Sequence, residues 1–178
     1  MFELNTGRLK IVPLNIEQFR LYIDYPQNLE KQLGLSESYT EKYDDDMERE
    51  IGEVLNKVLK NMEKNPFNYT WFTMWQIVLK EENKIIGTCG FNGLPDAEGK
   101  IEIGYALKPA YQKKGFMPEA IKEMIRFAFM HNKVKAIIAQ TPKDLLPSQK
   151  LLQNFGFVID SEIEGIITWI LKNPNSKN

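Results

Sequence analysis

A chain of 178 residues, of which 43% are hydrophobic, can bury one well-packed core, and a second domain would have to be very small. The 23 basic and 24 acidic residues leave a formal net charge of -1, so no global charge directs the chain toward nucleic acid or an anionic membrane. The single cysteine, Cys89, excludes an internal disulfide and makes a cysteine-based zinc site implausible, and the single histidine, His131, excludes a double-histidine relay. We therefore expect no metal cofactor.

The N-terminal residues do not resemble a signal peptide, and the apolar runs do not resemble a membrane span. The first eight residues lack the basic and apolar segments of a signal peptide. The longest apolar runs are far too short to span a bilayer. We therefore expect a soluble cytoplasmic protein whose partners include neither a membrane nor nucleic acid.

The first third of the chain predicts one strand and two helices. Residues 8–14 alternate polar and apolar side chains before a proline, which indicates a strand. Asn15 suits the N-cap of a helix over residues 16–23, and Pro26 ends that helix. In the strongly charged segment 38–64, apolar residues recur every three or four positions, as in an amphipathic helix.

The middle of the chain predicts a β-hairpin followed by a third strand. Residues 70–79 and 84–91 are rich in aromatic and β-branched side chains, and a polar turn over residues 80–83 separates them. After a second turn, residues 100–107 form the next strand. We expect these three strands to run antiparallel.

The C-terminal half predicts alternating helices and strands. The helix over residues 118–130 carries its apolar side chains on one face. A buried strand, a helix over residues 145–155 that stops at a glycine, and two final strands follow. This order predicts a single α+β domain with a mixed sheet over residues 1–172 and a polar tail over residues 173–178.

The junction between the strand 100–107 and the next helix is the strongest functional feature. A strand–turn–helix junction directs free backbone N–H groups and the positive end of a helix dipole to one place, where an anion can bind. Gly115 lets a phosphate approach the backbone closely, and Lys113 and Lys114 add positive charge. The segment has neither a Walker A ending nor the glycine triplet of a dinucleotide fold. By itself, the pattern more often marks an ordinary turn with solvated lysines.

Three ordered motifs resemble the GNAT superfamily of acetyl-CoA-dependent N-acetyltransferases, in the branch similar to ribosomal-protein alanine and serine N-acetyltransferases. The loop Gln112-Lys113-Lys114-Gly115-Phe116-Met117 resembles the family signature Gln/Arg-x-x-Gly-x-Gly/Ala, with Met117 in place of a small residue. Residues 101–111 resemble the family's fourth strand, residues 148–157 resemble its fourth helix and Gly-Phe ending, and residues 6–14 resemble its first strand.

The resemblance implies a GNAT-like mixed, mostly antiparallel sheet of about seven strands, flanked by helices and splayed between the fourth and fifth strands. It also implies acetyl-CoA as co-substrate, with Leu107 among the last strand residues beside the pantetheine arm. By the same resemblance, the pyrophosphate would be held by the loop residues Gln112, Lys113, Lys114, Gly115, Phe116 and Met117.

Acyl transfer to an amine requires that the ammonium lose a proton and that the departing thiolate be stabilised. An N–H donor must also stabilise the tetrahedral oxyanion, but no covalent enzyme intermediate is needed. Glu102 is the candidate base, because it shares a strand face with the small residues Gly104 and Ala106, which leave room for a substrate. Alternatively, Glu102 lies on a solvated face or pairs with a cation.

Ser148 occupies the position of the serine in the family's fourth helix, and the resemblance implies a hydrogen bond to the CoA sulfur or to a bound water. Alternatively, it is a first-turn or N-cap serine, which is common at helix starts. Two positions of this helix depart from the family pattern, in addition to Met117 in the loop. Leu145 stands where an asparagine is common, and Leu152 stands where many members carry a tyrosine acid. The helix therefore supplies no tyrosine acid.

We therefore predict an N-acetyltransferase that moves the acetyl group of acetyl-CoA to a primary amine by direct attack in a ternary complex. The acceptor would be a protein N-terminus or a small amine. The two departures allow an alternative, a non-catalytic acyl-CoA-binding or regulatory module of the same fold. A phosphate-ligand binder unrelated to CoA is a third hypothesis. We expect a monomer or a homodimer.

Overall fold

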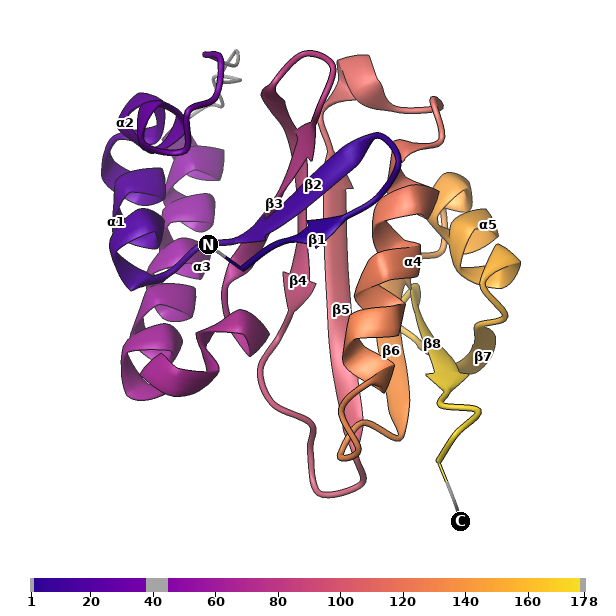
Figure 1. The fold of residues 1–178 in the computed structure, drawn as a ribbon. Helices are drawn as coiled ribbons and strands as arrows, with labels where there is room; N and C mark the ends of the chain where they lie inside the picture. Colours follow the sequence, from indigo (N-terminus) through magenta and orange to yellow (C-terminus); the bar gives the residue numbers. More distant parts are fainter. Residues whose placement is uncertain (1, 38–44, 177–178) are drawn as a thin grey trace.

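Eight strands form one sheet in the described part of the chain, and helices cover both of its faces (Figure 1). The computed structural model describes residues 2–37 and 45–176. The strands lie side by side in the order β1-β2-β3-β4-β5-β6-β8-β7. Their bounds are β1 (Leu4–Asn5), β2 (Leu9–Pro13), β3 (Met74–Leu79), β4 (Lys84–Phe91), β5 (Lys100–Leu107), β6 (Ala136–Pro142), β7 (Val158–Ile163) and β8 (Ile166–Lys172).

The sheet is mixed and mostly antiparallel, which confirms the predicted fold class. Each neighbouring pair runs antiparallel except β5 and β6, which are parallel. The prediction of about seven strands is one short, because Leu4–Asn5 forms a brief additional strand that pairs with β2. Two residues are too few for a periodic pattern, so this strand could not be predicted. The predicted fourth and fifth strands therefore correspond to β5 and β6.

The helices divide between the two faces of the sheet (Figure 1). No helix within the described ranges combines the length and the hydropathy that crossing a bilayer requires. The bounds are α1 (Ile16–Asp24), α2 (Pro26–Gln32) and α3 (Asp45–Lys64) on one face, α4 (Phe116–Phe129) and α5 (Leu146–Asn154) on the other, with short 3-10 helices at Pro66–Trp71 and Pro109–Tyr111.

Helix α2 has no counterpart in the prediction. Pro26 does follow the end of α1 at Asp24, but it is also the first residue of α2. Proline suits this position because its missing N–H has no partner there and its φ is already helical. The fully buried Leu29 then anchors α2 in a small core that it shares with α1 and α3. Of the charged helix predicted over residues 38–64, residues 38–44 lie outside the described part of the chain.

The first strand of the hairpin is shorter than predicted. The strand predicted over residues 70–79 is wrong at its start, because β3 begins at Met74 and a 3-10 helix ends at Trp71. The Trp71 ring lies 5.2 Å, centroid to centroid, from both Phe91 and Phe127. Tertiary packing of aromatic rings, and not strand pairing, therefore explains the hydrophobic composition of this stretch.

Helix α4 packs against the sheet and contributes much of the main core. It begins at Phe116, earlier than the predicted start at residue 118, because a proline fits in the first turn, where its missing N–H would have no intrahelical partner. Trp75 and Trp169, both almost fully buried, lie in the same core from β3 and β8. The interior face of α4 follows the helical period, with buried residues at Ala120, Ile121, Met124, Phe127 and Ala128.

The parallel strands β5 and β6 are paired at one end only. They share a register that runs from Lys100 opposite Ala136 to Glu102 opposite Ile138. Beyond Glu102, β5 continues to Leu107 but pairs only with β4, and β6 pairs only with β8. The strands therefore separate in the middle of the sheet, as predicted for the fourth and fifth strands. Their separated ends leave backbone N–H and C=O groups for a ligand to pair with.

Asn173, which follows the last strand, β8, is buried and hydrogen-bonded. Asn173, the first residue of the predicted tail, is only 8% exposed. Its Nδ2 donates to the Val134 carbonyl oxygen at 2.9 Å, and its backbone N–H donates to the Lys135 carbonyl oxygen at 2.8 Å. These bonds fasten the end of β8 to the segment that enters β6.

A buried amide in β3 has no partner among the described residues. Gln76 is fully buried between Val12 on β2 and Thr88 on β4, and neither its Nε2 nor its Oε1 makes a hydrogen bond there. An unsatisfied buried polar group is unfavourable, whereas an apolar side chain of similar shape is not. We expect Gln76→Met to raise the free energy of unfolding by about 1–2 kcal/mol, measured by urea denaturation.

Gln18 provides the matched control for this substitution. It is also buried, but its Oε1 accepts the Asn15 N–H at 3.0 Å as part of a capping box on α1. Gln18→Met should therefore lower the free energy of unfolding by about 1 kcal/mol. If Gln76→Met destabilises the protein as much as Gln18→Met does, the Gln76 amide has a stabilising partner.

Candidate active site

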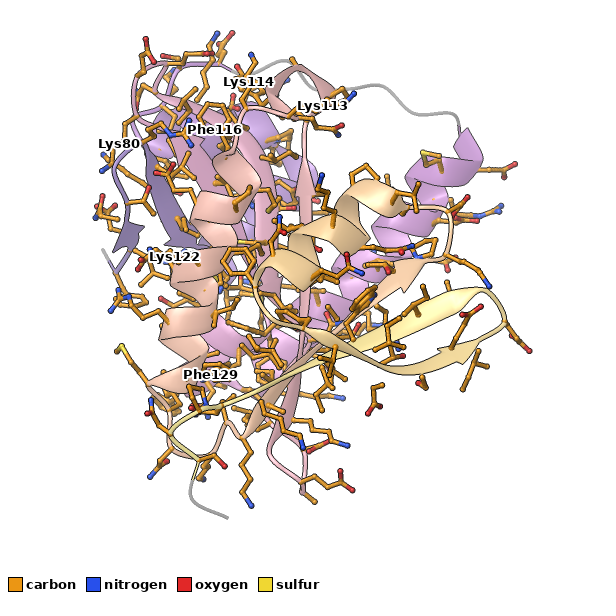
Figure 2. All side chains as sticks on the ribbon, turned by 90° about the vertical axis from the view of Figure 1, so that its right-hand side faces the viewer. Lys80, Lys113, Lys114, Phe116, Lys122 and Phe129 are labelled. Carbon is orange, nitrogen blue, oxygen red and sulfur yellow. The ribbon has the colours of Figure 1, made fainter. Side chains whose placement is uncertain are left out.

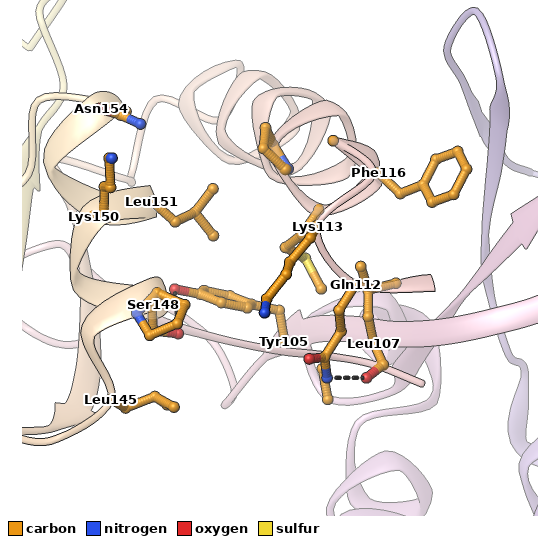
Figure 3. Close-up of a pocket in the computed structure, with 15 residues that line it drawn as sticks. Tyr105, Leu107, Gln112, Lys113, Phe116, Leu145, Ser148, Lys150, Leu151 and Asn154 are labelled. Atoms are coloured by element: carbon orange, nitrogen blue, oxygen red, sulfur yellow. Dashed lines mark hydrogen bonds between the residues drawn. The ribbon is translucent and has the colours of Figure 1, made fainter. Parts of the chain in front are cut away.

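A pocket lies beside the unpaired end of β5, between the loop that precedes α4 and the first turns of α5 (Figure 3). Its volume is about 580 Å³. Lys113 and Lys150 are the charged residues of its lining, and both are cations. The residues that line it are Tyr105, Ala106, Leu107, Gln112, Lys113, Gly115, Phe116, Met117, Pro118, Leu145, Pro147, Ser148, Lys150, Leu151 and Asn154.

The loop that precedes α4 offers backbone N–H groups at the edge of this pocket. Gly115, the N-cap of α4, has a φ of 78°, and Lys113 also lies in the left-handed region with a φ of 60°. No side chain makes an N-cap hydrogen bond on this helix, so the N–H groups of its first turn are available to a ligand. The positive end of the helix dipole lies at the same place. This geometry suits an anion.

The structure brings most of the predicted CoA-binding residues to this one pocket. Gln112 also links the strand to the loop, because its Nε2 donates to the Leu107 carbonyl oxygen at 3.0 Å (Figure 3). The side chain of Lys113 extends into the pocket (Figure 3). The predicted CoA-binding residues in the lining are Leu107, Gln112, Lys113, Gly115, Phe116 and Met117.

Lys114 is the predicted CoA-binding residue that the pocket lining lacks. Its Nζ lies 5.5 Å from the ring centroid of Tyr111, in a cation–π arrangement outside the pocket. Figure 2 shows Lys113, Lys114 and Phe116 together at the N-terminal end of α4. The ammonium group of Lys114 therefore does not contribute to the lining of the pocket.

Ser148 faces Tyr105, a tyrosine that is not among the predicted site residues. Ser148 is the third residue of α5, whose N-cap is Leu145, so it is a first-turn serine but not the N-cap. Its Oγ donates to the Tyr105 hydroxyl oxygen at 3.3 Å, and both residues line the pocket. Burial raises the pKa of Tyr105 above its ordinary value, although the bond from Ser148 acts in the opposite direction. Tyr105 therefore keeps its proton at neutral pH.

The strand alternation contained a signal for Tyr105. Side chains on β5 alternate between the two faces, so Tyr105 points to the face opposite Glu102. On that face, Ile101 and Ile103 are buried in the core and Tyr105 has a titratable hydroxyl. Only the folded chain shows that this hydroxyl has a hydrogen-bond partner in the pocket, because that partner, on α5, is 43 residues away in the sequence.

The two predicted catalytic residues lie on opposite faces of the sheet. Glu102 is partly exposed, pairs with Ile138 at the last position before β5 and β6 separate, and does not line the pocket that contains Ser148. On its own face, Gly104 and Ala106 are exposed, and a Cβ added to Gly104 would meet no atom within 4 Å. This face therefore has the open space beside Glu102 that the prediction required.

The two positions of the fourth-helix motif that depart from the family pattern lie in different environments. Leu145 is 46% exposed and lines the pocket, so an apolar side chain forms this part of the pocket wall. Leu152 is fully buried in the main core. A side chain at that depth makes no contact with a ligand in the pocket, so the proton donor must come from elsewhere if the reaction uses one.

Among residues 2–37 and 45–176, no group of three or more His, Cys, Asp or Glu side chains is arranged to hold a metal ion. Cys89 is buried on β4, and burial raises the pKa of its thiol far above the ordinary value. The thiol is therefore uncharged and unreactive at neutral pH, and Cys89 packs in the core as a small hydrophobic residue.

Fold and site together define a class of protein. A mixed sheet separates next to a helix N-terminus, and a cationic, mostly apolar pocket lies beside both, as the resemblance to acetyltransferases implied. The chain belongs to the GNAT acetyltransferase family, because the family model described as an acetyltransferase (GNAT) domain matches residues 8–158.

A sequence relative agrees with this assignment, and two solved structures share the fold. The uncharacterized N-acetyltransferase YjdG of Bacillus subtilis (strain 168) is 37% identical over 99 residues, which are 56% of this chain and 59% of YjdG. The match therefore spans little more than half of that relative. The ribosomal-protein-S5-alanine acetyltransferase from Vibrio fischeri has a TM-score of 0.67 and 19% identity, with all of both chains covered. The ribosomal L7/L12 alpha-N-protein acetyltransferase RimL, in complex with coenzyme A, has a TM-score of 0.64 and 12% identity, with 96% of this chain and 98% of that chain covered. These two likenesses show the fold.

Proposed function

We propose that this protein transfers the acetyl group of acetyl-CoA to a primary amine by direct attack in a ternary complex. The observation that carries the proposal is the pocket, which joins an anion-ready helix N-terminus to the Ser148–Tyr105 pair beside the separated strands. A long ligand with an anionic group at one end and a reactive thioester at the other matches this arrangement. The domain would span residues 1–172, in the cytoplasm, as a monomer or homodimer.

The donor would bind along β5. The backbone N–H groups of the loop from Lys113 to Met117 and the dipole of α4 would hold the pyrophosphate. Lys113 and Lys150 would add positive charge from two sides of the pocket (Figure 3). The unpaired edge of β5 near Leu107 would pair with the pantetheine amides, which resemble a peptide strand.

The acceptor would reach the thioester from the opposite face of the sheet. Glu102 lies there, next to the open space over Gly104 and Ala106. The strands β5 and β6 separate directly after the Glu102–Ile138 pair, so groups on the two faces can approach each other at this point. Glu102 would act as the base for the ammonium, directly or through one water.

The proposed step has a complete proton balance. Glu102 accepts a proton from the ammonium, and the amine nitrogen attacks the thioester carbon to form the C–N bond. The C–S bond then breaks, and the departing sulfur takes the proton of the Tyr105 hydroxyl. The second proton that the nitrogen loses on becoming an amide returns to the Tyr105 phenolate through water, and Glu102 releases its proton to the solvent, so both residues are restored. Because Ser148 donates to the Tyr105 oxygen, the Tyr105 proton is available for a different acceptor, and the bond also stabilises the phenolate that forms.

A screen of two classes of amine, with thiol release as the readout, identifies the acceptor. By their names, RimL acetylates the alpha-nitrogen of ribosomal protein L7/L12, and the Vibrio fischeri enzyme acetylates an alanine of ribosomal protein S5. We propose that peptides beginning with alanine or serine form the first arm and small amines, such as polyamines, the second. The alternative is a non-catalytic acyl-CoA-binding module, which the buried leucine at the tyrosine-acid position, Leu152, favours.

Thermal unfolding with and without acetyl-CoA tests the donor. At roughly a hundred times its dissociation constant, acetyl-CoA should raise the Tm by roughly 5–10 °C, because a ligand that binds only the folded state stabilises it. ADP is the control for a generic phosphate binder. An equal shift with ADP, or no shift with acetyl-CoA, contradicts the proposal. A shift without thiol release across both acceptor arms leaves the non-catalytic module.

A further inference from the structure

Arg8, the residue just before β2, connects the N-terminal end of the chain to the pocket loop. Its Nη1 donates to the Lys114 carbonyl oxygen and its Nη2 donates to the Gly115 carbonyl oxygen, both at 3.1 Å. Its guanidinium also lies 4.5 Å from the centroid of the Phe116 ring. One side chain therefore contacts three consecutive residues of the loop from a position 106 residues earlier in the chain.

Glu119 holds Arg8 in this position. Its Oε2 accepts the Arg8 Nε–H at 2.7 Å, and its Oε1 accepts the Arg8 backbone N–H at 2.8 Å and the Thr6 hydroxyl. Burial alone would raise the pKa of Glu119, but the bonds from Thr6 and Arg8 and the charge of Arg8 outweigh it, so the pKa is lowered. Glu119 is thus ionised at neutral pH and forms an ion pair with Arg8 in the first turn of α4.

The two carbonyl contacts determine where two N–H groups point. A trans peptide unit is planar, and its C=O and N–H bonds point in opposite directions. When Arg8 holds the carbonyls of Lys114 and Gly115, the N–H groups of Gly115 and Phe116 must point away from Arg8. Gly115 and Phe116 line the pocket, whereas Arg8 does not. Arg8 and the pocket therefore lie on opposite sides of the same two peptide units.

The loop needs such an external support. Lys113 and Gly115 both have a positive φ, and this conformation is unfavourable for a lysine. A planar fork with two parallel donors can fix two successive carbonyls, which a single ammonium group cannot do with the same geometry.

We propose that Arg8 is a positioning residue that aims the N–H groups of Gly115 and Phe116 at a phosphate of the donor. This inference rests on the proposed function, because it assigns a role in binding the pyrophosphate of acetyl-CoA. Arg8 has a second, electrostatic effect. It neutralises Glu119, whose carboxylate would otherwise stand in the first turn of the helix that receives the anion.

Arg8→Lys separates the two effects, because lysine keeps the positive charge but lacks the planar guanidinium group that holds two carbonyls at once. We expect the Kd of CoA, measured by calorimetry, to rise at least about tenfold, the usual consequence of losing charge-assisted hydrogen bonds. Arg8→Gln should weaken binding further, since Glu119 is then also uncompensated. Arg20→Lys is the matched control, because Arg20 forms a similar exposed ion pair with Glu63 at 2.6 Å, on α1 and α3.

A donor without a pyrophosphate gives a readout that a merely structural role would not affect. The KM for S-acetylpantetheine should be the same in the Arg8→Lys variant and in the wild-type protein. The KM for acetyl-CoA should be higher in the variant. Melting curves of the free proteins identify a variant that fails to fold. If the unchanged protein binds CoA and Arg8→Lys binds it equally well, the positioning role is overturned while the proposed function stands. An equal loss for both donors also overturns it.

Discussion

Replacing Tyr105 by phenylalanine is expected to lower kcat for acetyl transfer from acetyl-CoA by about a hundredfold or more, with little change in CoA affinity. The substitution removes only the hydroxyl that receives the bond from Ser148 at 3.3 Å inside the pocket. Burial raises the pKa of that hydroxyl, so it stays protonated at neutral pH and can deliver its proton to the departing thiolate. Steady-state kinetics and CoA titration together measure both quantities.

The acid role has a specific signature in the leaving group. A 4-nitrophenyl thioester releases a thiolate that needs no proton, so the loss caused by Tyr105→Phe should shrink strongly with this donor. Tyr111→Phe is the control, because the Tyr111 hydroxyl donates to Glu82 at 2.6 Å outside the pocket. An equal loss with both donors, or an unchanged kcat with acetyl-CoA, would remove Tyr105 from the role of acid.

Glu102→Gln is expected to lower kcat/KM for the amine by about a hundredfold near neutral pH. The amide keeps the size of the side chain but cannot accept the proton of the ammonium. As the pH rises toward the pKa of the acceptor, more of the amine is already deprotonated, so the difference between the variant and the unchanged protein should diminish. A pH–rate profile of both proteins with one acceptor measures this convergence.

The control for Glu102 is a carboxylate in the turn that precedes β5. Glu98 is suitable, because it is exposed and forms an ion pair with Lys100 at 2.7 Å. Glu98→Gln should leave kcat/KM unchanged. If the rates of Glu102→Gln match those of the unchanged protein across the pH range, Glu102 is a surface carboxylate, the alternative that the sequence left open.

Local patterns were sufficient for most of the elements. Alternation over β5 and the helical spacing of α4 depend on neighbours within a few residues, so both were predicted close to their observed bounds. The same patterns failed where a short element or a tertiary contact decided the outcome. Helix α2 begins at a proline that also ends α1, and Trp71 owes its burial to rings on β4 and α4.

The candidate site divides in the same way. The sequence by itself was sufficient to select the glycine and the lysines at the start of α4 as an anion-binding loop. It was also sufficient to place the β5 carboxylate on one strand face with two small residues, because both patterns depend on residues adjacent in the chain. Only the tertiary structure decided that Ser148 meets Tyr105, that Arg8 holds the loop and that Glu102 lies on the opposite face of the sheet from Ser148. These hydrogen bonds join residues 43 and 106 positions apart. They form because the packing of the sheet between two layers of helices brings the partners together. No local periodicity encodes such a contact, since strand order and helix placement together determine which distant side chains meet.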